Sequence, residues 1–113
     1  MTENIISAYK AAAKLHGEST RSGNSDRANQ AHDELQQLLK QITELGCDKD
    51  LQDLFNDEEA WVQLWAAVHT LEVDEKLACQ KLQTISDASI PLLSMNARYT
   101  LKEWKAGKLK FRT

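Results

Sequence analysis

The sequence predicts an all-α protein, a short stack of about six helices that begins with a long antiparallel helix pair and continues as a right-handed α-solenoid. Three observations support this prediction. The composition is rich in Ala, Leu, Gln, Lys and Glu and includes one proline and four glycines, which favours helices. Apolar residues recur at spacings of three and four, and no segment alternates at period two. The last four helices also look like two copies of one unit.

The first two helices are predicted to form the antiparallel pair. The first should end between Gly17 and Gly23, in the turn-rich stretch STRSGNS. Asn24 or Ser25 can cap the second, and Gly46 suits a left-handed C-terminal stop. The second helix carries the clearest amphipathic stripe of the chain: Ala28, Ala31, Leu35, Leu38, Leu39, Ile42 and Leu45.

Polar residues that favour helix starts divide the rest of the chain into four helices. Asp48 is expected to cap a short helix, and Asn56 or Asp57 the following one, which holds two tryptophans and has two glutamates in its first turn. Asp74 should cap the fifth helix. Pro91 suits the first position of the sixth, because its missing N–H is not needed there.

These four helices indicate an internal repeat of about 30 residues. Shifts of 30 or 31 place Leu51 on Leu82, Leu54 on Ile85, Ala67 on Ala97 and Leu71 on Leu101. A helix pair that repeats in this way buries its apolar face by stacking on its neighbours. We therefore expect one domain, 1–113, with the N-terminal helix pair at 1–46, two helix-pair repeats at 47–105 and a basic tail at 106–113.

The stretch WVQLWAAVHTL raises the question of whether its two tryptophans form core or bind a partner. Leu64, Val68 and Leu71 share a helical face with both rings, which favours core. The repeat pairing places Trp65 in the core. Trp61 falls in the first turn beside acidic residues, where a partly exposed ring would suit an anchor for a partner.

Charge is distributed unevenly along the chain. From Glu44 to Glu75 there are ten acidic residues against Lys49 alone, whereas the stretch from Arg98 onward carries six bases and one acid. Acids at helix starts and turns should cluster in space, and a negative surface steers a basic partner. The predicted partner-binding residues are Asp48, Asp50, Asp53, Asp57, Glu58, Glu59, Trp61, Glu72, Asp74 and Glu75.

Several functional classes find no support in the sequence. No apolar run reaches the length of a membrane span, and the N-terminus lacks the pattern of a signal peptide, so a cytoplasmic protein is expected. The basic tail could bind phosphates, but the acidic segment would repel the same polyanion, so we expect no nucleic-acid partner. Glycine-rich phosphate loops and GxSxG motifs do not occur, and we predict no cofactor and no enzymatic activity.

The cysteines and histidines carry no signature of a reactive centre. Cys47 and Cys79 form no CxxC pair and are expected to be reduced thiols. The histidines, His16, His32 and His69, fall on three different predicted helices and match no HExxH pattern. His16 and His32 could face each other across the first helix pair, which leaves open a shared metal as an alternative to solvated side chains.

Three motifs together resemble a known family: LHGESTRSGNSDRANQAHDEL, VQLWAAVHTLE and the closing LKEWKAGKLKF. They are similar to the bacterial domain-of-unknown-function family numbered two thousand and nineteen, small HEAT-like helical-repeat proteins. The similarity extends from about Tyr9 to Phe111. The family tends to carry an arginine where this chain has Gln63. The resemblance implies a HEAT-like fold and no reaction.

Together these observations predict a cytoplasmic protein-interaction module that is monomeric when free. Small helical-repeat proteins of this type often accompany secreted bacterial toxins as immunity partners, so the first expectation is an immunity protein that occludes a basic toxin domain, such as a nuclease in contact-dependent growth inhibition. One alternative is a general helical-repeat adaptor for a host protein. Another is a small metalloenzyme built on His16 and His32.

Overall fold

The chain folds into helices throughout the part that its computed structural model describes, residues 2–109. The elements are α1 (Thr2–Ser22), α2 (Ser25–Leu45), α3 (Asp48–Asp53), the 3-10 turn η1 (Leu54–Asn56), α4 (Ala60–Thr70), α5 (Glu75–Asp87) and α6 (Leu93–Lys105). Within these residues there is no strand, which confirms the all-α class. The last residues of the predicted basic tail, 110–113, lie outside the described part.

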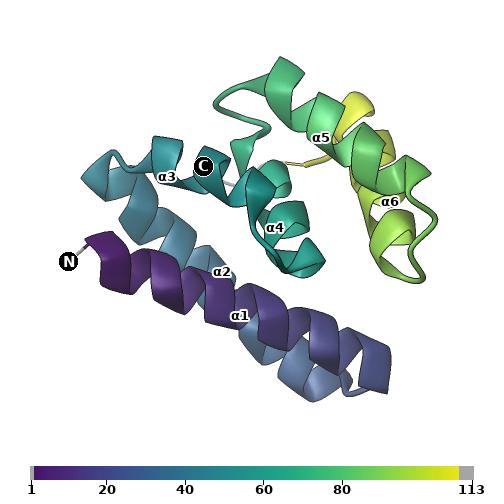
Figure 1. Cartoon of the computed structure of the whole chain (residues 1–113), viewed down its shortest axis with the longest axis horizontal. Coiled ribbons are helices and arrows are strands. Elements are labelled where there is room, and N and C mark those ends of the chain that lie inside the picture. Colours follow the sequence, from purple (N-terminus) through teal and green to yellow (C-terminus); the bar gives the residue numbers. More distant parts are fainter. Residues whose placement is uncertain (1, 110–113) are drawn as a thin grey trace.

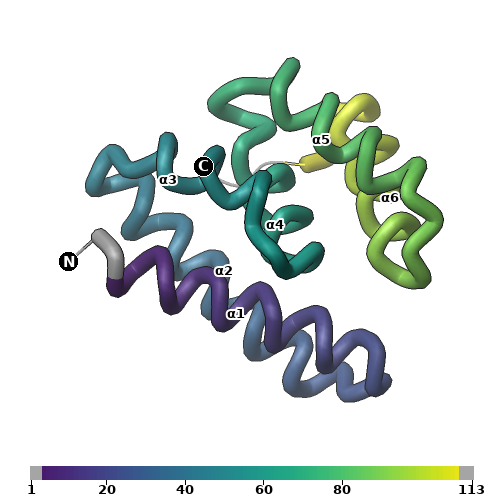
Figure 2. The backbone as a smooth tube through the Cα atoms, in the orientation of Figure 1, coloured from purple at the N-terminus to yellow at the C-terminus, as the bar shows by residue number. Residues whose placement is uncertain are grey.

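The helices form two antiparallel pairs with α4 between them (Figure 1). The N-terminal pair, α1 and α2, packs on α4, and α4 in turn contacts α5 and α6. Figure 2 shows the chain turning back at the end of each long helix, so that α5 and α6 form the opposite end of the molecule from α1 and α2. This arrangement is consistent with a helical-repeat stack; the internal repeat itself stays a prediction.

The ends of the N-terminal pair follow the sequence signals closely. The Asn24 side chain accepts a hydrogen bond from the backbone N–H of Arg27 at 3.1 Å and caps α2. Gly46 closes the same helix with φ 69°, a left-handed conformation that glycine adopts without strain. Asp74 likewise caps α5 through the N–H of Leu77 at 3.2 Å.

Among the described residues, no helix is both long and apolar enough to cross a membrane.

Three predicted helix starts are wrong. Cys47, not Asp48, precedes α3, and it makes no capping bond through its side chain. Glu59, not Asn56 or Asp57, caps α4 by accepting the N–H of Trp61, so the two expected first-turn glutamates lie before the helix. A turn displaces the start of α6 from Pro91 to Leu93, because Leu92 adopts a left-handed φ of 65° that no helix can include.

The burial of the two tryptophans of α4 is the reverse of the prediction. Trp61 is 2% exposed and belongs to the core, whereas Trp65 is partly buried at the edge of it. Gly17 explains the difference, since a Cβ atom added there would collide with three ring atoms of Trp61. The indole ring therefore lies directly on the backbone of α1. A partner cannot reach the ring in this conformation, so the prediction of Trp61 as an exposed anchor is wrong.

Candidate protein-binding surface

The first part of the predicted acidic surface lies on α3. Leu51 is fully buried and turns one side of this short helix inward. Asp53 is exposed, and Asp48 and Asp50 are half-buried beside it. Among residues 2–109, Asp50 and Asp53 make no ion pair or hydrogen bond through their side chains. Their carboxylates are therefore available to a partner.

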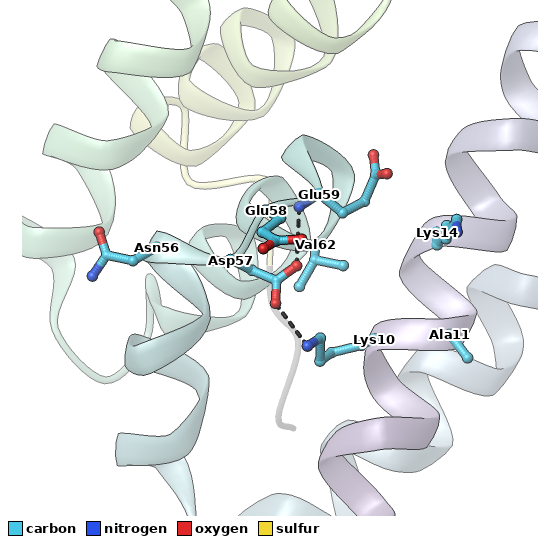
Figure 3. Close-up of a pocket in the computed structure, with 8 residues that line it drawn as sticks. All are labelled: Lys10, Ala11, Lys14, Asn56, Asp57, Glu58, Glu59 and Val62. Atoms are coloured by element: carbon cyan, nitrogen blue, oxygen red, sulfur yellow. Dashed lines mark hydrogen bonds and ion pairs between the residues drawn. The ribbon is translucent and has the colours of Figure 1, made fainter.

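The second part, at the start of α4, is compensated from within the molecule. The Lys10 ammonium of α1 lies 2.8 Å from a carboxylate oxygen of Asp57, whose side chain is only 13% exposed (Figure 3). Burial alone would raise the pKa of Asp57. The ion pair with Lys10 and the hydrogen bond from the backbone N–H of Glu59, at 3.0 Å, outweigh the effect of burial, so the pKa of Asp57 lies below its ordinary value. Asp57 is thus a structural ion-pair partner of α1.

The neighbouring glutamates line an open hollow of about 770 Å³ between α1 and the start of α4. Figure 3 shows Lys14 on the α1 wall of this hollow, with the Glu59 side chain on the opposite wall. Glu58 is exposed at the same hollow and, within the described chain, has no charged partner. The segment itself contains Lys49 as its one base, but α1 supplies two lysines at this hollow, Lys10 and Lys14, which are remote in sequence.

The third part is the turn between α4 and α5, where Glu72, Asp74 and Glu75 are exposed. Asp74 caps α5, as described above. Glu75 accepts a hydrogen bond from the indole N–H of Trp104 at 2.8 Å, which ties this turn to the end of α6. Asp74 and Glu75 therefore serve the fold as well as the surface.

A groove of about 450 Å³ lies between the first part and α5. It is lined from α3 and η1 by Gln52, Asp53, Phe55 and Asn56, and from α5 by Leu77, Gln80, Lys81 and Thr84. Leu77 lies one turn after Asp74, so the groove runs from the acids of α3 toward the acidic turn. Of the predicted acids, Asp53 lines this groove, whereas Asp57, Glu58 and Glu59 lie on the α1 side.

A cluster of aromatic and imidazole rings, only partly anticipated from the sequence, joins α1, α2 and α4. The rings of His16, His32 and His69 lie 4.9, 5.7 and 5.4 Å from the ring of Trp65, measured between centroids. The Tyr9 hydroxyl and the Nδ1 atom of His69 are hydrogen-bonded at 2.7 Å, fully buried. Helical spacing from the turn at Gly23 predicts the approach of His16 and His32, but no local signal reveals Trp65 between them.

This cluster does not form a metal centre of ordinary composition. No group of three or more His, Cys, Asp or Glu side chains among the described residues is arranged to hold a metal ion. The Nδ1 atom of His16 and the Nε1 atom of Trp65 are buried without a hydrogen-bond partner in the described chain. The rings pack mainly edge to face, as aromatic pairs prefer, so the cluster can lock α1 and α2 onto α4.

We expect the stability of the protein to fall on mild acidification through His16. Burial lowers the pKa of this imidazole below 6.5, and the charge of His32 lowers it further. Below pH about 6.5 the unfolded chain therefore takes up a proton before the folded one does, and stability is lost as the pH falls through the lower, folded pKa. Urea unfolding midpoints between pH 7.5 and 5 should decline, and His16→Asn should flatten the decline; an equal slope in both proteins would contradict this.

Comparison with known proteins adds no family to this geometry: no family model, curated protein or solved structure matches the chain. The likeness to the HEAT-like family numbered two thousand and nineteen stays a prediction.

Proposed function

We propose that this chain is a protein-interaction module that binds a basic protein partner through the acids of α3, Glu58 and the turn between α4 and α5. The observation that carries the proposal is the set of acids on α3 beside the groove between α3–η1 and α5, which Asp53 lines. Asp50, Asp53 and Glu58 perform no bonding role within residues 2–109. Carboxylates without an internal role are best placed to pair with a partner's lysines and arginines.

The partner class that fits this surface best is a basic toxin domain, with the chain acting as its immunity protein. A nuclease binds a polyanion and so carries a positively charged groove, which an acidic helical surface complements. The acids of α3 would cover that groove and exclude the substrate. The function is occlusion, which requires no chemistry from this chain, and Trp61 takes no part because it is buried.

A second candidate function, an adaptor for an extended protein segment, is favoured by the lining of the same groove. Gln52, Asn56 and Gln80 line it and make no side-chain hydrogen bond within the described chain. An amide side chain both donates and accepts, as the main chain of an extended peptide requires. Genomic position separates the two functions, since a toxin gene directly upstream favours immunity and a housekeeping operon favours the adaptor.

The proposal predicts that the triple reversal Asp50→Lys, Asp53→Lys and Glu58→Lys weakens partner binding by on the order of a hundredfold or more, because three favourable charge contacts become repulsive. The partner is first identified by affinity capture from the native cells with mass spectrometry. Its affinity for the purified wild-type and variant chains is then measured by calorimetry, and protection of cells that express the partner is scored in parallel.

A matched control reverses three exposed acids of α1 and α2: Glu18→Lys, Asp33→Lys and Glu34→Lys. This variant changes the net charge equally but leaves the proposed surface intact, so its affinity should stay within a few fold of wild type. Far-UV circular dichroism should be unchanged in both variants. Equal binding by the two variants would contradict a role for the acids of α3 and Glu58.

A further inference from the structure

Four of the five exposed large apolar residues of the described chain lie on α6 and in the turns before and after α5. Ile90 is 42% exposed, Met95 57% and Tyr99 63%, and Val73 in the nearby acidic turn is 47% exposed. The remaining exposed large apolar residue of the described chain, Leu45, lies at the end of α2. Isolated exposed apolar residues are ordinary, but a contiguous group is typical of an interaction site. We call Val73, Ile90, Met95, Tyr99 and Lys102 the α6 patch.

Helix geometry places most of this patch on one line along α6. Leu93, Ala97 and Leu101 turn the opposite side of the helix into the core. Met95, Tyr99 and Lys102 follow one another at spacings of four and three, so they share the outward side. The helix contacts α5 and α4 and forms the end of the stack in Figures 1 and 2. The exposed side of α6 thus combines two large apolar residues, Met95 and Tyr99, with the basic residues Arg98, Lys102 and Lys105.

The turn that leads into α6 is held in place at a conformational cost. Ser89 and Leu92 both adopt left-handed backbone conformations, with φ 56° and 65°. Such conformations cost non-glycine residues about 1 kcal/mol or more each. The Ser94 hydroxyl accepts the N–H of Ile90 at 2.8 Å and donates to the carbonyl of Ile85 at 2.7 Å, which fixes the turn. These two hydrogen bonds therefore hold Ile90 in its exposed position.

Charges of both signs border these apolar residues. Lys102 extends the outward side of α6, and Arg98 lies on its flank. Val73 lies between Glu72 and Asp74 in the sequence, and the hydrogen bond from Trp104 to Glu75 holds this turn against the end of α6. The patch therefore contains a basic half and an acidic half, each with its own apolar residues. A two-fold interface needs such a surface, since each half meets the other half of the partner.

We infer that the α6 patch binds a second copy of this chain, with Met95, Tyr99 and Lys102 of one copy against Val73 and the acidic turn of the other. One helix of 13 residues is about 20 Å long. It covers less than the roughly 800 Å² per partner of a standard interface. The association is accordingly a weak, concentration-dependent dimer. It shares the turn between α4 and α5 with the proposed partner surface, but Met95, Tyr99 and Lys102 belong to the dimer alone, so variants of α6 test the dimer and variants of α3 test the proposed function.

Sedimentation velocity on the full chain over a wide concentration range tests the inference. The wild type should shift toward twice the mass of one chain as its concentration rises. The double variant Met95→Gln and Tyr99→Gln should weaken dimerisation at least tenfold. Leu45→Gln is the matched control, because Leu45 and Met95 are equally exposed, at 57%; it should behave as wild type. A wild type that stays monomeric throughout, or a dimer that the double variant does not weaken, overturns the inference.

A charge exchange tests the pairing of the two halves. Lys102→Glu and Glu72→Lys should each weaken self-association. An equimolar mixture of these two variants should restore it, because each basic half then meets an acidic one. Failure of the mixture to recover would overturn the two-fold pairing. Both positions are exposed, and unchanged circular dichroism and melting temperature confirm that the variants are folded.

Discussion

Trp61→Ala should lower the free energy of unfolding by about 3–5 kcal/mol, the usual penalty for truncating a large core side chain. The ring is 2% exposed and fills the contact between α4 and the backbone of α1 at Gly17. Its loss leaves a cavity where the N-terminal pair meets the rest of the stack. Urea unfolding followed by circular dichroism at 222 nm, at a pH near 7.5, measures the change.

Trp65→Ala is the matched comparison, because it removes the same side chain from the same helix. Trp65 is only partly buried, so the penalty should be clearly smaller. The repeat pairing in the sequence predicts the opposite order, with Trp65 as the core residue. A loss for Trp65→Ala equal to or greater than that for Trp61→Ala would contradict the packing described above.

The helices are predictable from the sequence because their signals are local. Asn24, Gly46 and Asp74 lie within a few residues of the groups that they satisfy. The apolar stripe of α2 faces the core from Ala31 to Ile42 as its spacing predicts, but Leu45, at the last turn, is exposed. The failures also have local causes. Asp57 and Glu59 both have the chemistry of a cap and both lie in extended backbone, but the helix begins only after Glu59, and the Asp57 carboxylate accepts the N–H of Glu59 instead. The left-handed Leu92 carries no sequence signature.

The candidate site is less predictable because it depends on contacts between distant segments. Ten acids in the middle of the chain indicate a negative surface, but α1 contributes Lys10 and Lys14, which are about 45 residues away in sequence. The roles of Trp61 and Trp65 depend on the same helix. The two side chains are about 40° apart around α4, too little for periodicity to distinguish them. What distinguishes them is Gly17, which allows α1 to approach one ring.

Gly17→Ala should therefore destabilise the protein by about 1–3 kcal/mol, the usual cost of overpacking, although alanine in place of glycine ordinarily strengthens a helix interior by about 1 kcal/mol. The added methyl group would overlap Cγ and two other atoms of the Trp61 indole. Because the neighbouring atoms belong to a rigid ring enclosed by the core, the ring must move as a unit and pull α4 from α1.

A double-mutant cycle separates these two effects of the methyl group. In the Trp61→Ala background the ring is absent, so Gly17→Ala should become neutral or stabilising by up to about 1 kcal/mol. The difference between the effects of Gly17→Ala in the two backgrounds is the coupling energy of Gly17 and Trp61, and it should have the size expected for residues in direct contact. If Gly17→Ala has the same effect in both backgrounds, Gly17 does not serve Trp61, and another contact must hold the N-terminal pair on α4.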